Sequence, residues 1–223
     1  MRIMHVVSAP AAGGAEVYVK DLAKALVKKG HVVTVAFLGR AREIGRSEEY
    51  EKKFLAELGE AGVNWFFIGN ECRRRPWLGM WRVRRFLKSD GTEIYHSHLP
   101  FGVIFGAGLL CSKVYTHHSI NPRLNWLTYR IFNQLIDRYV GISKVCAGKL
   151  REYSDQEVTP ILNGVDIEKF PKVKRPLVSN NELINAISVG RIHPHKGYFF
   201  LGKRCINPPT LPDRVESNNS DLI

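Results

Sequence analysis

Two cations follow a short apolar stretch in the last quarter of this 223-residue chain. Residues 186–189 have the character of a buried strand; Gly190 and Arg191 come directly after it, and Lys196 follows five residues later. A glycine turn at the carboxyl end of a strand lets a ligand approach the backbone. An arginine can hold two phosphate oxygens at once, and a lysine adds a point charge. Arg191 and Lys196 are therefore predicted to bind a diphosphate group.

Histidines gather at the ends of two other predicted strands: His96 and His98 at one, His117 and His118 at the next. Because the carboxyl ends of parallel strands face one ligand crevice, we expect these side chains to line one rim. Strand alternation places His96 and His98 on the same face, so a metal site is an alternative. No Asp, Glu or Cys nearby in the sequence completes a ligand set, and no metal is expected.

Gly13 and Gly14 stand between the first predicted strand and the first predicted helix. Glycines at this place let a ligand reach backbone N–H groups and the positive end of the helix dipole. The alternative is that they only form a tight turn. The dinucleotide fingerprint G-x-G-x-x-G is absent, which argues against an NAD enzyme.

Basic residues concentrate in one segment of a chain whose net charge is +12. Residues 73–88 hold seven basic side chains and no acidic one, and 77–88 have helical spacing. One interpretation is a helix that faces the core and has a solvated basic side. Another is a surface that settles on an anionic membrane, with tryptophan at the interface. The residues expected to contact such a surface are Trp81, Arg82, Arg84 and Arg85.

Apolar runs alternate with amphipathic segments along the chain, which predicts an α/β fold with a doubly wound, Rossmann-like parallel sheet. The strands are expected at residues 2–8, 31–38, 63–68, 92–98, 113–117, 138–142 and 161–162. The helices are expected at residues 15–29, 47–61, 77–88, 101–112, 125–136 and 143–153, with a mobile basic loop at 40–46. The domain plan is a first domain at 1–170, a linker at 171–182, the start of a second domain at 183–201 and a disordered tail at 202–223.

Two motifs give the chain a family resemblance. Asn163-Gly164-Val165-Asp166 followed by Phe170 resembles the sequence that closes the first domain of family 4 retaining glycosyltransferases, which have the two-domain GT-B fold. Gly190-Arg191 followed by Lys196-Gly197 resembles the motif that opens their nucleotide-sugar domain. The pair in this order and at this separation is more specific than either motif alone.

The resemblance implies transfer of a sugar from a nucleotide diphosphate-sugar to an acceptor hydroxyl with retention. No metal is required in that family, because Arg191 and Lys196 would neutralise the departing diphosphate. Family members carry H-x-H and T-x-H after the corresponding strands, which implies that His118 hydrogen-bonds the donor sugar and that His98 lines the acceptor side. The Gly13-Gly14 backbone would approach the donor phosphate or the acceptor.

The resemblance covers residues 1–201 and then stops. The 22 residues that follow cannot form a second α/β domain, and the family's E-x7-E element has no counterpart. The sequence therefore resembles a truncated enzyme, an N-terminal half with one strand of its partner domain, and we expect it to be inactive alone.

The basic segment suggests a lipid-linked glycan or envelope polysaccharide as acceptor. The alternatives are a non-catalytic module that binds anionic membrane or glycolipid, and, less favoured, an RNA-binding α/β protein; no nucleic-acid partner is expected. Four cysteines without a C-x-x-C pair and an apolar start too short for a signal peptide indicate a cytoplasmic protein, in peripheral contact with the inner face of the membrane.

Overall fold

A computed structural model of the chain describes residues 1–119 and 124–164. All of them belong to the first of two compact units, Met1–Pro171. The predicted linker, second-domain strand and tail lie outside the described residues, and so do Arg191 and Lys196. No helix in the described part of the chain has both the length and the apolar character needed to cross a bilayer.

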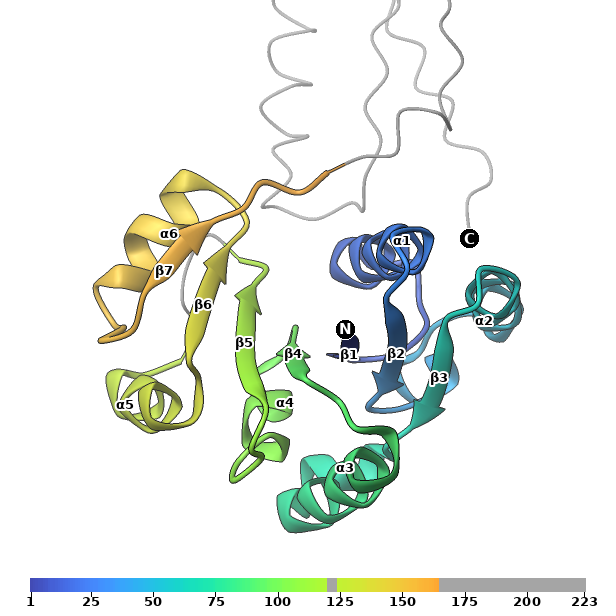
Figure 1. Cartoon of the computed structure of the whole chain (residues 1–223), viewed down its shortest axis with the longest axis horizontal. Coiled ribbons are helices and arrows are strands. Elements are labelled where there is room, and N and C mark those ends of the chain that lie inside the picture. The colour runs from blue at the N-terminus through green and yellow to red at the C-terminus, as the bar shows by residue number, and fades with distance from the viewer. Residues whose placement is uncertain (120–123, 165–223) are drawn as a thin grey trace, which may run out of the picture. The chain divides into compact units, whose positions relative to one another are not determined.

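The described residues form a seven-stranded parallel sheet in the order β3-β2-β1-β4-β5-β6-β7 (Figure 1). The order runs outward from β1 to β3 and then crosses back to β4, so the sheet is doubly wound, with its switch point between β1 and β4. This confirms the predicted fold class. The strands are β1 Arg2–Val7, β2 Val32–Phe37, β3 Asn64–Phe67, β4 Ile94–Ser97, β5 Ser112–His117, β6 Arg138–Gly141 and β7 Val158–Pro160.

Helices cover both faces of the sheet. Figure 1 shows α1 and α2 on one face, and α3, α4 and α5 on the other. Two serines begin helices as predicted, since the side chains of Ser47 and Ser143 accept hydrogen bonds from backbone N–H groups in the first turns of α2 and α6. The helices are α1 Gly14–Lys28, α2 Glu48–Glu60, α3 Pro76–Asp90, α4 Pro100–Phe105, α5 Trp126–Leu135 and α6 Lys144–Arg151, with short 3-10 turns η1 Ala41–Ile44 and η2 Asn70–Arg73.

Two apolar clusters hold these layers together. The larger one joins the strands from β1 to β4 with α1 and α2 on one side and α3 and α4 on the other. The smaller one packs α5 and α6 against β5 and β6, around the buried rings of Tyr115, Phe132 and Tyr139. The strands between two helical layers are apolar on both faces, which explains their nearly continuous apolar sequences.

The predicted helix at 101–112 is wrong in its second half, because α4 ends at Phe105. Gly108 has a left-handed φ of +68°, which breaks the helical path, and Gly106 lies so close to Tyr95 that a Cβ there would approach the ring to 2.6 Å. The chain needs this early stop to reach β5. The last strand is also misplaced: residues 161–162 were expected to form it, but it spans Val158–Pro160.

The basic stretch 40–46 is an ordered turn and not the mobile loop that was expected. Its residues include η1, and the buried carboxylate of Glu51 fixes its beginning. Glu51 accepts hydrogen bonds from the guanidinium of Arg40 at 2.9 Å and from the backbone N–H of Ala41 at 2.6 Å. The loop is therefore anchored to α2 at a defined position.

Candidate functional site

A row of histidine rings crosses the switch point of the sheet. His5 of β1 is in register with His96 of β4, and their ring centroids lie 5.1 Å apart. His98 follows on the same face, with its ring 4.1 Å from that of His96 and 5.3 Å from that of His5. The predicted common face of His96 and His98 is confirmed, and His5 is an unforeseen third member.

Hydrogen bonds connect these rings to the carboxyl-terminal rim. His5 Nδ1 lies 3.0 Å from His98 Nε2, and His98 Nδ1 lies 3.0 Å from His118 Nε2. His96 Nε2 bonds the hydroxyl of Thr116 at 2.7 Å. We call His5, His96, His98 and His118 the histidine cluster. His5 and His98 are buried and His118 is half-buried, so the cluster runs from the core toward the surface.

Burial keeps the whole cluster neutral at physiological pH. It lowers the pKa of His5 and of His118 to about 4, since a charged ring would lose its hydration. The pKa values of His96 and His98 are well below the ordinary range for the same reason, and neighbouring histidines lower them further. Neutral rings have one N–H and one acceptor nitrogen each, which suits hydrogen-bond chains.

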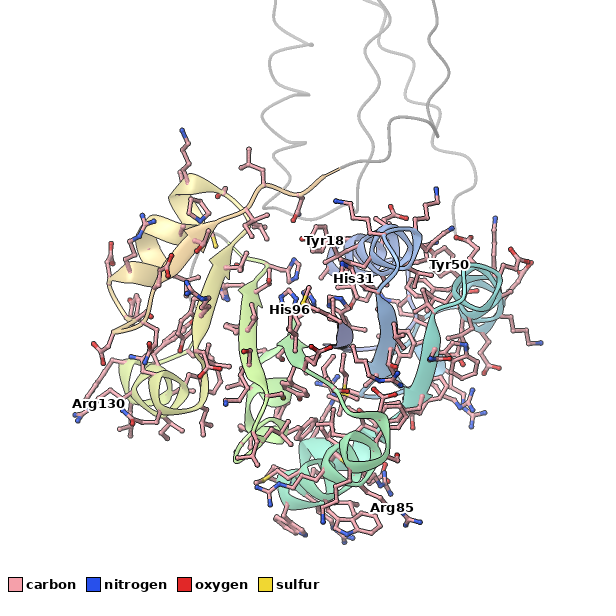
Figure 2. The ribbon with its side chains drawn as sticks, viewed as in Figure 1. Tyr18, His31, Tyr50, Arg85, His96 and Arg130 are labelled. Carbon is pink, nitrogen blue, oxygen red and sulfur yellow. The ribbon has the colours of Figure 1, made fainter. Side chains whose placement is uncertain are left out.

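Tyr18 links the cluster to the first helix. Its ring meets the ring of His118 edge-on at 5.6 Å and that of His98 at 6.2 Å. Figure 2 shows Tyr18 on α1, above the region of the sheet that carries His96. Because α1 begins at Gly14, Tyr18 is about one turn from the glycine pair. The structure thus brings His98, His118 and the first turns of α1 to one region.

His117 belongs to the opposite face. Its Nδ1 lies 3.1 Å from the hydroxyl of the buried Tyr115, and its backbone carbonyl accepts a bond from the thiol of Cys146. Three of the four histidines expected at one rim belong to the cluster. His117, the last residue of β5, packs on the opposite face of the sheet. The strand period explains this, since His117 and His118 are adjacent and point to opposite sides.

The cluster has the residue type for a metal, but ring nitrogens of all four histidines already have hydrogen-bond partners. The ligand atoms of His5, His96 and His98 lie within 4.8 Å of one another, and among the described residues no carboxylate or thiol completes this group. A tetrahedral zinc ion with Zn–N bonds of about 2.0–2.1 Å needs nitrogens about 3.4 Å apart. Here His5 Nδ1 and His98 Nε2 are hydrogen-bonded to each other at 3.0 Å, and His96 Nε2 is hydrogen-bonded to Thr116 at 2.7 Å. We therefore assign no metal to it.

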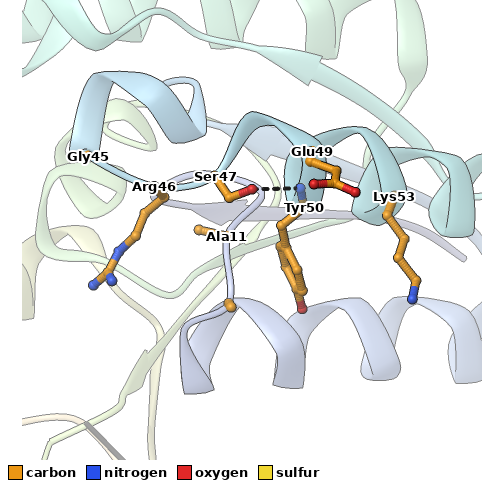
Figure 3. A pocket seen from close by; sticks show the side chains of 8 residues that line it. Ala11, Gly45, Arg46, Ser47, Glu49, Tyr50 and Lys53 are labelled. Atoms are coloured by element: carbon orange, nitrogen blue, oxygen red, sulfur yellow. Dashed lines mark hydrogen bonds between the residues drawn. The ribbon is translucent and has the colours of Figure 1, made fainter. Parts of the chain in front are cut away.

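A hollow of about 540 Å³ opens beside the loop that precedes the glycine pair (Figure 3). Arg46 and Lys53 supply two cations and Glu49 one carboxylate, while the Ser47 hydroxyl already accepts the backbone N–H of Tyr50. Within the described residues, the side chains of Arg46 and Lys53 form no hydrogen bond or close ion pair, although the charge of Lys53 acts on Glu57. The hollow is lined by Ala11, Ala12, Gly45, Arg46, Ser47, Glu49, Tyr50 and Lys53.

The basic helix α3 presents its tryptophans to solvent. Gly79 and Val83 form its buried side, whereas Trp77 and Trp81 are 65% and 55% exposed. The two rings are four residues apart and therefore lie on the same face of the helix. Leu78, Val83, Phe86 and Leu87 pack against the core, so α3 faces the core with one side and presents its two tryptophans to solvent with another.

Its three arginines do not form a uniform basic face. Arg82 donates to the carbonyl of Ile68 and forms an ion pair with Glu71 at 2.7 Å. Arg84 donates to the carbonyl of Ala107 at 3.0 Å. Arg85 extends over the ring of Trp81, with 5.5 Å from its guanidinium carbon to the ring centroid. Arg82 and Arg84 thus fix α3 to neighbouring loops, and Arg85 is exposed beside the tryptophans.

The family model described as Glycosyltransferase Family 4 matches residues 12–169, well over half of the chain. The chain belongs to glycosyltransferase family 4. No curated protein sequence matches this family 4 chain at a significant level.

Solved structures of other proteins have a fold similar to that of this chain. A glycosyltransferase from Rickettsia africae is 17% identical, with a TM-score of 0.60 over 97% of this chain and 53% of its own. HepE from Anabaena, solved with UDP and glucose, is 16% identical with a TM-score of 0.55 over 75% and 46%. The lipopolysaccharide galactosyltransferase WaaB is 13% identical with a TM-score of 0.56 over 82% and 50%. The family 4 chain spans about half the length of these proteins.

The histidine that sequence reasoning missed in this family 4 chain is His5. It stands inside an apolar strand, and only the register between β1 and β4 reveals that it faces His96. Its residue type was the one available signal, because a titratable side chain within an apolar strand requires a polar partner.

Proposed function

We propose that this family 4 chain forms the acceptor-side half of an enzyme that moves a sugar from a nucleotide diphosphate-sugar to an acceptor hydroxyl with retention. The sugar leaves a diphosphate oxygen and bonds the acceptor oxygen, and the acceptor's proton leaves with the diphosphate. The observation that carries the proposal is the position of His118, a neutral, half-buried ring after β5 that is hydrogen-bonded to His98 and lies beside the first turns of α1, next to the switch point. In open α/β sheets this is where ligands bind.

Each residue of the proposed site has a separate part. His118 hydrogen-bonds the donor sugar through Nδ1, the nitrogen that His98 leaves available. His98 is buried with both ring nitrogens engaged, so it supports His118 from behind. The amides at Gly13 and Gly14 approach donor phosphate or acceptor. Arg191 and Lys196 would neutralise the departing diphosphate, which is the charge stabilisation that such a transfer needs.

The hollow beside the glycine pair suits the acceptor. Arg46 and Lys53 favour an acceptor with an anionic group, such as a lipid-linked phosphate or an acidic glycan. Its lining includes Ala11 and Ala12, the residues just before Gly13. An acceptor held there would lie next to the turn from which α1 begins.

Donor binding and transfer test the proposal on this chain and on one extended with the C-terminal half of a family member. We expect transfer by the extended chain from one member of a panel of nucleotide diphosphate-sugars, and a loss of at least tenfold in kcat/KM on His118→Ala. His31→Ala is the matched control, because His31 lies between α1 and β2, outside the histidine cluster. Equal transfer by both variants would contradict the role given to His118.

A second function, docking on anionic membrane, rests on Trp77 and Trp81. Two tryptophans more than half exposed on one helical face, beside the cations Arg85 and Lys88, match an interfacial surface. The combination would bring the enzyme to a lipid-linked acceptor. RNA binding is the competing explanation of the positive charge, and the vesicle experiment described below distinguishes the two.

A further inference from the structure

The innermost nitrogen of the histidine cluster is an orphan. His5 Nε2 is buried, and among the described residues it has no hydrogen-bond partner. His5 is 1% exposed, so bulk water does not reach it either. Its other nitrogen, Nδ1, bonds His98. Whether this nitrogen has a proton determines which nitrogen is protonated in each ring of the hydrogen-bonded chain, as far as His118.

Each neutral ring has a single ring N–H, so the chain from His5 to His118 can be polarised in two ways. In the first, His5 Nδ1–H donates to His98 Nε2, and His98 Nδ1–H donates to His118 Nε2. His118 then has its proton on Nδ1. In the second, every bond is reversed, and His118 has its proton on Nε2.

The two arrangements differ in what they leave buried at His5. The first leaves an acceptor lone pair without a donor at Nε2, whereas the second leaves an N–H without an acceptor. Among backbone groups, orphaned buried N–H groups are rarer than under-satisfied carbonyls, and we extend this order to the ring nitrogens of histidine. The first polarity is therefore favoured.

We infer that His5 is a positioning residue that fixes His118 as the Nδ1–H tautomer, acting through His98. His118 then meets its ligand as a hydrogen-bond donor. An N–H group at this position binds hydroxyl or phosphate oxygens and cannot take a proton from the substrate that receives the sugar. The inference rests on the proposed function only for the ligand of His118, because the tautomer itself is a property of the protein without ligand.

Nitrogen-15 NMR of the full 223-residue chain measures the tautomers directly. Two-bond couplings between ring nitrogens and ring carbon-bound protons distinguish Nδ1–H from Nε2–H, and each of the eight histidines can be assigned with a single variant. At about pH 8.5, without ligand, we expect Nδ1–H at His5, His98 and His118. An Nε2–H tautomer at His118 would overturn the inference.

Replacing His5 by Asn or by Asp gives a matched pair of nearly equal size. The amide of His5→Asn can donate to His98 Nε2, which leaves one N–H and the oxygen unsatisfied, whereas accepting from His98 would leave both N–H groups unsatisfied, so His118 should stay Nδ1–H. Once ionised, the carboxylate of His5→Asp can only accept, so it should bind His98 Nε2–H and reverse the chain, leaving His118 as Nε2–H. An unchanged His118 in folded His5→Asp protein would contradict control by His5.

These outcomes are independent of enzyme activity. If His5→Asp does not fold, the wild-type and His5→Asn spectra still decide the tautomer. Metal bound by the purified chain, with histidine signals that change on chelation, would show that the cluster holds an ion and would refute the hydrogen-bonded chain. If the tautomers are as expected and the extended chain neither binds nor transfers from any nucleotide-sugar, the proposed function fails and the inference about His5 stands.

Discussion

Gly79 of α3 lies directly against the ring of Phe105 of α4: a Cβ on this glycine would come within 2.5 Å of the ring. The contact joins the helix that carries the exposed tryptophans to its neighbour on the same face of the sheet. Both residues are buried.

We therefore expect Gly79→Ala to lower the free energy of unfolding by about 1–3 kcal/mol, the usual cost of overpacking a core. The matched control is Gly59→Ala in α2, where an added Cβ meets nothing within 4 Å. It should be neutral or stabilise by up to about 1 kcal/mol, because alanine favours a helix more than glycine does. Urea denaturation measures both, and equal effects would refute the packing argument.

Acid should destabilise the chain through the histidine cluster. The pKa of His5 and of His118 is about 4 in the folded chain, against about 6.5 for an exposed histidine, so the unfolded state binds more protons between these values. Stability should be complete above pH 6.5 and fall as the pH drops toward 4, by about 3 kcal/mol for His5 alone. Urea midpoints that are equal at pH 7 and pH 5 would contradict this.

Vesicle binding should depend on particular residues of α3. We expect Trp77→Ser with Trp81→Ser to weaken binding to anionic vesicles strongly, and Arg85→Gln to weaken it by about 1 kcal/mol at low salt. Arg82→Gln is the control, because Arg82 is held by Ile68 and Glu71 and its loss should mainly affect stability. Equal binding to neutral and anionic vesicles would reject the electrostatic part, and salt-sensitive binding to RNA alone would favour the RNA-binding alternative.

The buried carboxylate of Glu51 anchors the turn at 40–46, which contributes Gly45 and Arg46 to the hollow. Glu51→Gln should destabilise the chain by about 1–3 kcal/mol, since the backbone N–H of Ala41 and the guanidinium of Arg40 lose their charged acceptor. Glu60→Gln, at the exposed end of the same helix, should change stability by less than about 0.5 kcal/mol. Thermal unfolding compares the two, and similar shifts would mean that Glu51 does not anchor the turn.

The sheet could be predicted from sequence because its strands are covered on both faces. Runs such as those of β1 and β2 contain almost only apolar residues, which identifies them without knowledge of their partners. The predicted ends of helices and strands were wrong where a contact between residues distant in sequence decides them. The expected helix after β4 stops at Phe105 because Tyr95 occupies the space beside Gly106, and no local pattern shows that.

The candidate site was predictable in part for the same reason. Alternation within β4 placed His96 and His98 on one face, since that is a local rule. The role of His5 needed the strand order, because β1 pairs with β4 and the two rings are far apart in the chain. The orientation of Trp77 and Trp81 was left open because their spacing fits a core-facing helix and an exposed stripe equally well.

The strand order also determines when each edge of β1 can pair during synthesis of the chain. β1, β2 and β3 are complete once residue 67 has been synthesised, but the other edge of β1 waits for residues 94–97. Throughout that interval a nascent chain has an unpaired apolar strand with a lone imidazole, the kind of edge that recruits neighbouring chains. The second edge of β1 can therefore pair only after the residues of α3 have been synthesised.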